Sequence, residues 1–146
     1  MTVKTASGQD AGNASEARFI HAYITAALWS SNDESDDAGG NPLDDNYTAD
    51  DLDPDTRAEM EKDCAAFIDL FWSDLFRPGI YQGRSGAHAV ELAGHDFWLT
   101  RNGHGCGFWD GDWQEPFASQ MDAYCKRVGE YSLIVGDDGR IHGMGG

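Results

Sequence analysis

The stretch DPDTRAEMEKDCAAFIDLFWSDLFRPG, residues 53–79, gives the clearest structural signal in the chain. It predicts an amphipathic helix. Asp53 can cap free backbone N–H groups, and Pro54 is preorganised for the first helical position, so the helix begins here. Arg77-Pro78-Gly79 ends it. Between these limits the apolar residues recur at helical spacing: Met60, Cys64, Phe67, Ile68, Phe71, Trp72 and Leu75.

Two further helices are predicted on either side of this one. Upstream, apolar residues recur at three- and four-residue steps from Ser15 to Ser30, with Ser15 as the cap. Downstream, Pro116 opens a helix that Gly129 ends. Residues 87–93 are expected to form a short helix. Residues 1–13 are small, polar and without periodicity, which predicts a disordered tail.

Two segments predict β-hairpins. In residues 96–110, DFWLTRNGHGCGFWD, Phe97, Leu99 and Arg101 alternate with Trp98 and Thr100 before Asn102-Gly103, a pair that tolerates positive φ. Residues 131–142 carry a GDDG turn between YSLIV (131–135) and RIH (140–142). We therefore predict one α+β domain over residues 14–146, with two to four helices packed on one face of a small antiparallel β-sheet built from the two hairpins.

The acidic loop at residues 33–55 holds ten carboxylates and not one Lys or Arg. The whole chain has 26 acidic and 10 basic side chains, a net charge of −16. Gly39, Gly40 and Pro42 prevent a helix, while Leu43, Tyr47 and Leu52 are isolated apolar anchors, so we expect an ordered but irregular loop. The contact residues predicted on it are Asp36, Asp37, Asp44, Asp45, Asp50, Asp51, Asp53 and Asp55.

This charge restricts the partners that the protein can have. Direct binding to DNA or RNA is disfavoured because phosphate contacts require Lys and Arg, and anionic membrane surfaces are disfavoured for the same reason. The first eighteen residues do not have the pattern of a signal peptide, and the longest apolar run, residues 19–29, is too short to cross a bilayer. Three widely spaced cysteines favour a reducing cytoplasm.

Three segments together carry a resemblance to a known family. HDFWLTRNGHGCGFWD (95–110), FIHAYITAALWSS (19–31) and NPLDDNYTADDLDPDT (41–56) resemble a family of small acidic proteins carried by bacteriophages and prophages, with no assigned activity. The resemblance implies phage origin and the host cytoplasm, and it transfers no active-site residue. Cys106 departs from the small residue usual at that place in the family, which argues against a shared ligand or nucleophile there.

Two alternatives compete with a binding role for the acidic loop. One is a small metal-dependent or cysteine/histidine enzyme centred on His95, His104, Cys106 and Asp110. A structural zinc site needs four convergent ligands, and only His104 and Cys106 are close in sequence, so no metal or cofactor is expected. The other is a solvated virion or housekeeping domain, because a surface with 19 Asp and 7 Glu also serves solubility.

A protein that displays carboxylates along a ridge can occupy a basic groove meant for phosphates, because B-form DNA carries one negative charge per about 1.7 Å of its axis. The sequence therefore predicts a non-enzymatic phage accessory protein. Its expected partner is a basic, nucleic-acid-binding host protein or complex, bound through the acidic loop. A DNA-mimicking inhibitor of a host defence system, CRISPR or restriction, is the specific hypothesis. The sequence leaves the oligomeric state open.

Overall fold

The computed structural model describes residues 6–34, 40–104, 107–109 and 111–145. Within these residues the chain forms four helices and two antiparallel pairs of short strands, so the predicted α+β class is confirmed. The helices are α1 (Ala6–Ser30), α2 (Pro54–Leu75), α3 (Ala87–Arg101) and α4 (Phe117–Val128). The strand pairs are β1 (Asn32–Asp33) with β2 (Asn41–Pro42), and β3 (Tyr131–Val135) with β4 (Ile141–Gly145).

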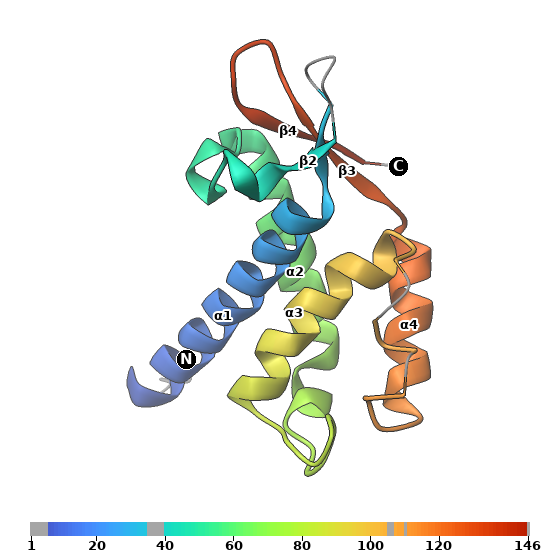
Figure 1. The fold of residues 1–146 in the computed structure, drawn as a ribbon. Helices are drawn as coiled ribbons and strands as arrows, with labels where there is room; N and C mark the ends of the chain where they lie inside the picture. Colours follow the sequence, from blue (N-terminus) through green and yellow to red (C-terminus); the bar gives the residue numbers. More distant parts are fainter. Residues whose placement is uncertain (1–5, 35–39, 105–106, 110, 146) are drawn as a thin grey trace.

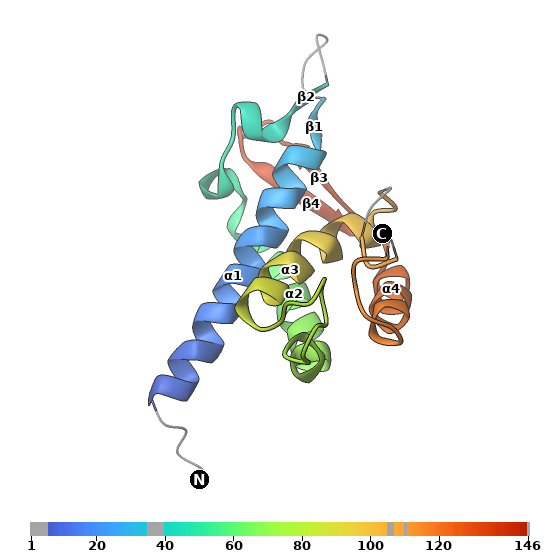
Figure 2. The same cartoon turned by 60° about the horizontal axis from the view of Figure 1, so that its bottom comes forward.

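The helices pack as a bundle with the strands gathered at one end. The long helix α1 lies across α3, α2 lies behind them, and α4 flanks α3 on the side away from α1 (Figures 1 and 2). The β3–β4 hairpin and residues 32–34 and 40–53 lie together at the end of the molecule where α1 ends (Figure 1). No helix in the described part of the chain is long and apolar enough to cross a membrane.

The helix ends largely follow the sequence prediction. Asp53 caps α2, with Pro54 at its first position, and Gly129 ends α4 with φ of +84°. Helix α1 begins at Ala6, inside the segment expected to be a disordered tail. Helix propagation adds one hydrogen bond per residue, so a packed C-terminal part extends a helix over residues that show no periodicity. Residues 1–5 lie outside the described residues.

Aromatic rings make up the centre of the core, as expected for a domain so rich in them. Phe67 contacts both Phe19 and Phe97, with ring centroids 5.2 and 4.8 Å away, and Phe108 stacks on it at 5.6 Å. All four rings are fully buried. These contacts join α1, α2 and α3 to the segment after α3. Among the tryptophans of the 95–113 region, only Trp109 is exposed.

The hairpin predicted at residues 96–110 is wrong: residues 96–101 are the last turns of α3. Every residue from Phe97 to Arg101 is buried. Because α1 and α4 both pack against α3, no exposed face marks the helical period, and five buried residues in a row also fit a strand. Asn102 and Gly103, with φ of +72° at Gly103, end this helix instead of turning a hairpin. Cys106 and Asp110 lie outside the described residues.

The second predicted hairpin, at residues 131–142, is confirmed as β3–β4. The two strands pair from Tyr131 with Gly145 to Val135 with Ile141. In the turn between them, the Gly139 N–H donates to the Gly136 carbonyl at 3.0 Å. Tyr131, Leu133 and Ile141 are buried, so one face of the hairpin covers the helices. The other two-stranded sheet, β1–β2, had no signal in the sequence, because two residues per strand show no alternation.

The buried guanidinium of Arg101 joins four segments. Its Nη1 donates to the Tyr23 hydroxyl on α1 and to Oδ2 of Asp63 on α2, both at 2.9 Å. Its Nε donates to the Gly129 carbonyl after α4 at 2.7 Å, and the Tyr131 ring of β3 lies 5.4 Å from the guanidinium carbon. Burial alone would lower the pKa of Arg101, but the oxygens of Tyr23 and Asp63 outweigh it and raise the pKa. The group is therefore a permanent cation inside the bundle.

Helix α3 lies directly against the backbone of α1 at Gly94. A β-carbon at this position would overlap the carbonyl oxygen of Phe19 on α1. Ala26 and Ala27 on α1 and Ala93 on α3 are fully buried as well. Small side chains let two helices come near enough for their backbones to touch, so the sequence of this seam fixes the distance between α1 and α3.

Two buried thiols predict a loss of stability at alkaline pH. Burial raises the pKa of Cys64 well above its ordinary value, and burial followed by the charge of Asp122 raises that of Cys125. In the unfolded chain thiols ionise above about pH 8.5, whereas the native state keeps them protonated. The free energy of unfolding should therefore fall as pH rises beyond that value, by roughly 1 kcal/mol per pH unit for each thiol.

Urea denaturation at about pH 7, 8.5 and 10 measures this dependence. The control is the double variant Cys64→Ala, Cys125→Ala, which lacks both groups and should show a shallower fall. If the variant and the unaltered protein lost stability in parallel, the thiols would not be its source.

Candidate functional site: the acidic end of the molecule

Apolar anchors hold the acidic segment against the body of the protein. Leu43 is fully buried, Leu52 is nearly so, and Tyr47 is partly buried. The Leu43 N–H donates to the Ser31 carbonyl, and the Asp53 N–H donates to the Ile141 carbonyl, each at 2.8 Å. Two short 3₁₀ helices, η1 (Leu43–Asp45) and η2 (Ala49–Asp51), lie between these bonds. The prediction of an ordered but irregular loop is confirmed for its described residues.

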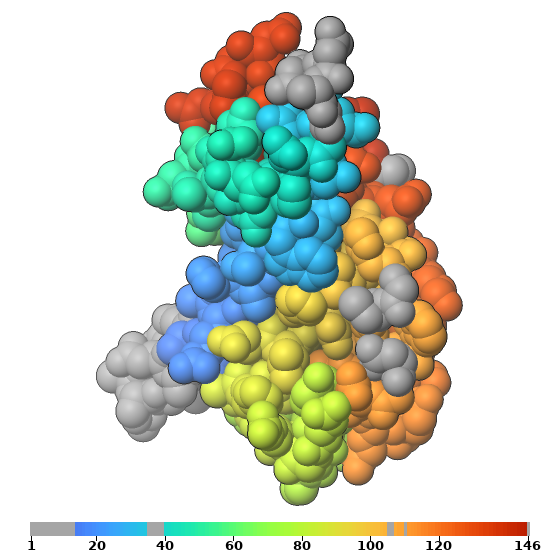
Figure 3. Space-filling view, viewed as in Figure 1, coloured from blue at the N-terminus to red at the C-terminus, as the bar shows by residue number. Residues whose placement is uncertain are grey.

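The hairpin turn adds charge to this segment from a distant part of the sequence. Leu52 forms an isolated parallel bridge with Ile141, which places Asp137 and Asp138 of the β3–β4 turn at the same end of the molecule. We call residues 32–34, 40–57 and 136–142 together the acidic end; Figure 3 shows its later two segments, in cyan to green and red, at the upper end of the molecule. The three segments of the acidic end together carry ten carboxylates against two arginines. The prediction from sequence missed Asp137 and Asp138.

Two of the predicted contact residues stabilise the local backbone. Asp51 Oδ2 accepts from the Thr48 N–H at 2.8 Å and completes a capping box on η2. Asp53 Oδ2 accepts from the N–H groups of Asp55 and Thr56 at 3.2 and 3.3 Å, and so caps α2. Both carboxylates are half-buried. Their charge contributes to the acidic end, but one oxygen of each carboxylate already accepts hydrogen bonds from the backbone.

Four of the predicted contact residues have free carboxylates. Asp44, Asp45, Asp50 and Asp55 are exposed, and their side chains make no hydrogen bond or ion pair with any residue that the structure describes. Asp36 and Asp37 lie outside the described residues. The structure thus divides the predicted set into capping carboxylates and carboxylates available to a partner.

His142 lies between two carboxylates at the edge of the acidic end. Its Nε2 is 3.0 Å from Asp138 Oδ1, and its Nδ1 is 3.9 Å from Asp53 Oδ2. The Arg140 N–H, followed by His142, lowers the pKa of the exposed Asp138. Asp138 therefore stays ionised to a lower pH than a carboxylate without these donors.

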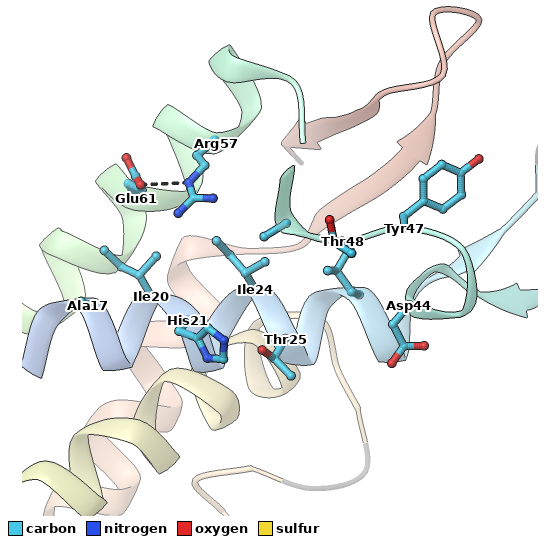
Figure 4. Close-up of a pocket in the computed structure, with 12 residues that line it drawn as sticks. Ala17, Ile20, His21, Ile24, Thr25, Asp44, Tyr47, Thr48, Arg57 and Glu61 are labelled. Carbon is cyan, nitrogen blue, oxygen red and sulfur yellow. Dashed lines mark hydrogen bonds and ion pairs between the residues drawn. The ribbon is translucent and has the colours of Figure 1, made fainter. Parts of the chain in front are cut away.

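A groove opens beside the acidic end, between α1, the η1–η2 segment and the first turns of α2. Its volume is about 460 Å³. Figure 4 shows Ile20 and Ile24 of α1 along its floor, with Tyr47, Thr48 and Asp44 at one end and the Arg57–Glu61 pair at the other. The remaining lining residues are Ala17, His21, Thr25, Leu28 and Ala49.

Sequence reasoning missed this groove, although α1 carries a sign of it. Ile20, Ile24 and Leu28 follow one another at four-residue steps, beside the Phe19 and Tyr23 face that packs into the core. An apolar stripe wider than one face predicts a second contact surface. The opposite wall comes from residues 44–61, and only the fold brings the two together.

The structure separates the described members of the alternative site at residues 95–110. His95 lies on α3 against the Trp29 ring of α1, with centroids 5.8 Å apart. His104 lies beyond the end of α3, where it lines a cavity with Asp122 and Lys126 of α4. Among the described residues no group of three or more His, Cys, Asp or Glu side chains is placed to hold a metal ion.

The described cysteines are unsuited to nucleophilic catalysis. Cys64 and Cys125 are buried, and their raised pKa values keep them as thiols at neutral pH. Only a thiolate is a good nucleophile, and reactive cysteines lie in partly exposed, electropositive surroundings.

No protein-family model matches the chain, and no curated protein or solved structure gives a significant match to it.

Proposed function

We propose that this chain is a non-enzymatic phage accessory protein that binds a basic, nucleic-acid-binding host protein through its acidic end. In this proposal it works in the host cytoplasm as a DNA mimic that inhibits a defence system, either CRISPR or restriction. One observation carries the proposal: ten carboxylates and two arginines meet at one end of the molecule, and several of these carboxylates have no partner among the residues that the structure describes.

The electrostatics of the acidic end support binding to a cationic surface. Like charges held close together repel one another, and an opposing basic surface relieves that repulsion. Exposed carboxylates also attract a basic partner over about 8 Å at physiological salt, which speeds association. The free carboxylates of Asp44, Asp45 and Asp50 lie on the η1–η2 segment, which two buried leucines fix in place. A partner therefore meets charges that are already positioned.

The resemblance of residues 95–110 to phage-borne proteins supports the phage origin. Phages gain from blocking nucleases that attack their DNA, and such enzymes bind DNA in basic channels. A carboxylate array that enters such a channel competes directly with the phosphate backbone. The proposed partner is therefore defined by its chemistry: a protein surface that binds nucleic acid.

The triple variant Asp44→Asn, Asp45→Asn, Asp50→Asn tests this role. It removes three free charges and leaves the caps Asp51 and Asp53 intact. Basic proteins captured by the unaltered protein from a bacterial host lysate should be displaced by duplex DNA, and the variant should bind them at least about tenfold more weakly. Affinity is measured by titration of the purified partner at about 0.1 M salt, where the screening length is about 10 Å.

The matched control removes the same charge elsewhere, with Asp69→Asn, Glu91→Gln and Glu130→Gln, all exposed and outside the acidic end. It should bind within a few-fold of the unaltered protein. Equal weakening by both triple variants would mean that only net charge matters, as for a domain whose acid serves solubility. A partner that duplex DNA does not displace would contradict DNA mimicry.

A further inference from the structure

The groove beside the acidic end has an apolar floor, which binding by charge alone would not require. We propose that it receives a basic amphipathic helix of the partner, with the apolar side chains of that helix on Ile20 and Ile24 and its Lys or Arg side chains on Asp44 and Glu61. This inference rests on the proposed function and deepens it, because it names the part of the partner that is recognised. The groove thus adds shape and apolar contact to an interaction that charge begins.

The floor offers apolar surface in a concave setting. Ile24 is almost fully buried and Ile20 is partly buried, and Leu28 and Ala49 continue the apolar lining. The volume of about 460 Å³ lies in the range of about 300–1,000 Å³ that is typical of ligand sites. Each apolar side chain buried there would contribute about 1.5–3 kcal/mol, so one or two of them change affinity measurably.

Carboxylates lie at both ends of this floor. Asp44 lies at the η1 end and is free. At the other end, Glu61 Oε2 is 3.1 Å from Arg57 Nε, and both side chains are more than 40% exposed, so water screens the pair and a second cation can share Glu61. A neighbouring cavity of about 420 Å³ shares Ala49, Arg57 and Glu61 with the groove and adds one carboxylate, Asp50, and one cation, Arg140. An apolar strip bordered by carboxylates is complementary to a helix with an apolar stripe and basic flanks.

The charge of the rim favours this occupant over an anionic one. A nucleic acid or a phosphorylated ligand would bring more negative charge next to Asp44, Asp50 and Glu61, and the two arginines of the rim, Arg57 and Arg140, do not balance these three carboxylates. Helix-in-groove recognition uses apolar anchors three and four residues apart, the same spacing with which Ile20, Ile24 and Leu28 line α1. The geometry of the floor thus suits a helix that lies along α1.

Two synthetic peptides test the inference. Both are basic helices of about 14 residues with identical Lys positions. One carries Leu at helical spacing on one face, and the other carries Ser at the same places. At about 0.1 M salt the Leu peptide should bind at least about tenfold more tightly than the Ser peptide, because only the Leu peptide buries apolar side chains.

The isoleucine methyl groups locate the binding by NMR. The δ1 methyl signals of Ile20 and Ile24 should shift when the Leu peptide is added to the unaltered protein. The signal of Ile134, which is exposed on the outer face of β3, should stay in place. The variant Ile20→Ser should lose most of the preference for the Leu peptide, whereas Ile134→Ser, the same change at an exposed isoleucine outside the groove, should keep it.

The outcomes separate this inference from the proposed function. If both peptides bind equally and the Ile20 and Ile24 signals do not move, the groove is not the site, while binding through the acidic end stands. If neither peptide binds even at about 20 mM salt, where charges act over about 20 Å, both proposals fail. Because the NMR measurement uses the unaltered protein, it decides the question even if Ile20→Ser does not fold.

Discussion

Replacing Arg101 by methionine is expected to lower the free energy of unfolding by about 3–5 kcal/mol. Methionine fills much of the same space but donates no hydrogen bond. Tyr23, Asp63 and the Gly129 carbonyl would each lose the guanidinium that they share at 2.7–2.9 Å. The Tyr23 side chain is fully buried, so water cannot replace its donor without opening the bundle.

Arg77→Met is the matched control for this change. Arg77 also bonds an aspartate, with its Nε 3.0 Å from Asp74 Oδ1, and its guanidinium carbon lies 4.3 Å from the centre of the Phe117 ring. The Arg77 side chain is 50% exposed, against 4% for Arg101. Exposed ion pairs contribute about 0–1 kcal/mol, so the control should change stability little. Urea denaturation of both variants at pH 7 measures the difference, and similar losses would mean that burial does not set the strength of the Arg101 network.

Gly94→Ala is expected to destabilise the protein by about 1–3 kcal/mol or more, although alanine is the better helix former. In an exposed helix the same change would stabilise by about 1 kcal/mol. Here the new methyl group overlaps the Phe19 carbonyl oxygen, which belongs to the backbone of α1 and cannot rotate away. The two helices must separate, and the packing between their aromatic side chains weakens with them.

Thermal and urea unfolding measure this effect, with Ser73→Ala on the exposed side of α2 as the control. The control changes helix propensity without touching a helix seam, so it should stabilise slightly or have no effect. A gain in stability for Gly94→Ala would show that α1 and α3 are not in backbone contact at this point.

Local chemistry explains the parts of the fold that sequence predicts correctly. The start of α2 depends on Asp53 and Pro54, and the backbone groups on which they act belong to the residues that follow directly, up to Thr56. The β3–β4 hairpin depends on its turn residues in the same way. The error at residues 96–101 has a tertiary cause. Helices α1 and α4 pack on both sides of α3 and bury every residue from Phe97 to Arg101, so the sequence shows no alternation of apolar and polar residues at helical spacing. Prediction from one sequence works where a signal and its structural effect are close together in the chain.

In the candidate site, too, some features follow from nearby residues and others depend on contacts between distant segments. The charge of the 33–55 loop and its apolar anchors were predictable from composition and spacing. That Asp51 and Asp53 are caps depends on where the 3₁₀ helix η2 and the helix α2 begin, which the sequence indicates only for α2. Asp137 and the groove join the site through contacts between distant segments, such as the bridge from Leu52 to Ile141.

The acidic end has two kinds of carboxylate, free and capping, and a mutation has different consequences at each kind. At Asp44, Asp45 and Asp50 a mutation to glutamate, asparagine or lysine alters attraction to a partner while the chain keeps its shape, so binding strength can drift by small steps. At Asp53 the oxygen must reach two particular N–H groups, which a longer side chain does not do in the same way. Under the proposed function, the affinity for a partner can therefore change without any change in the structure of the loop that presents these charges.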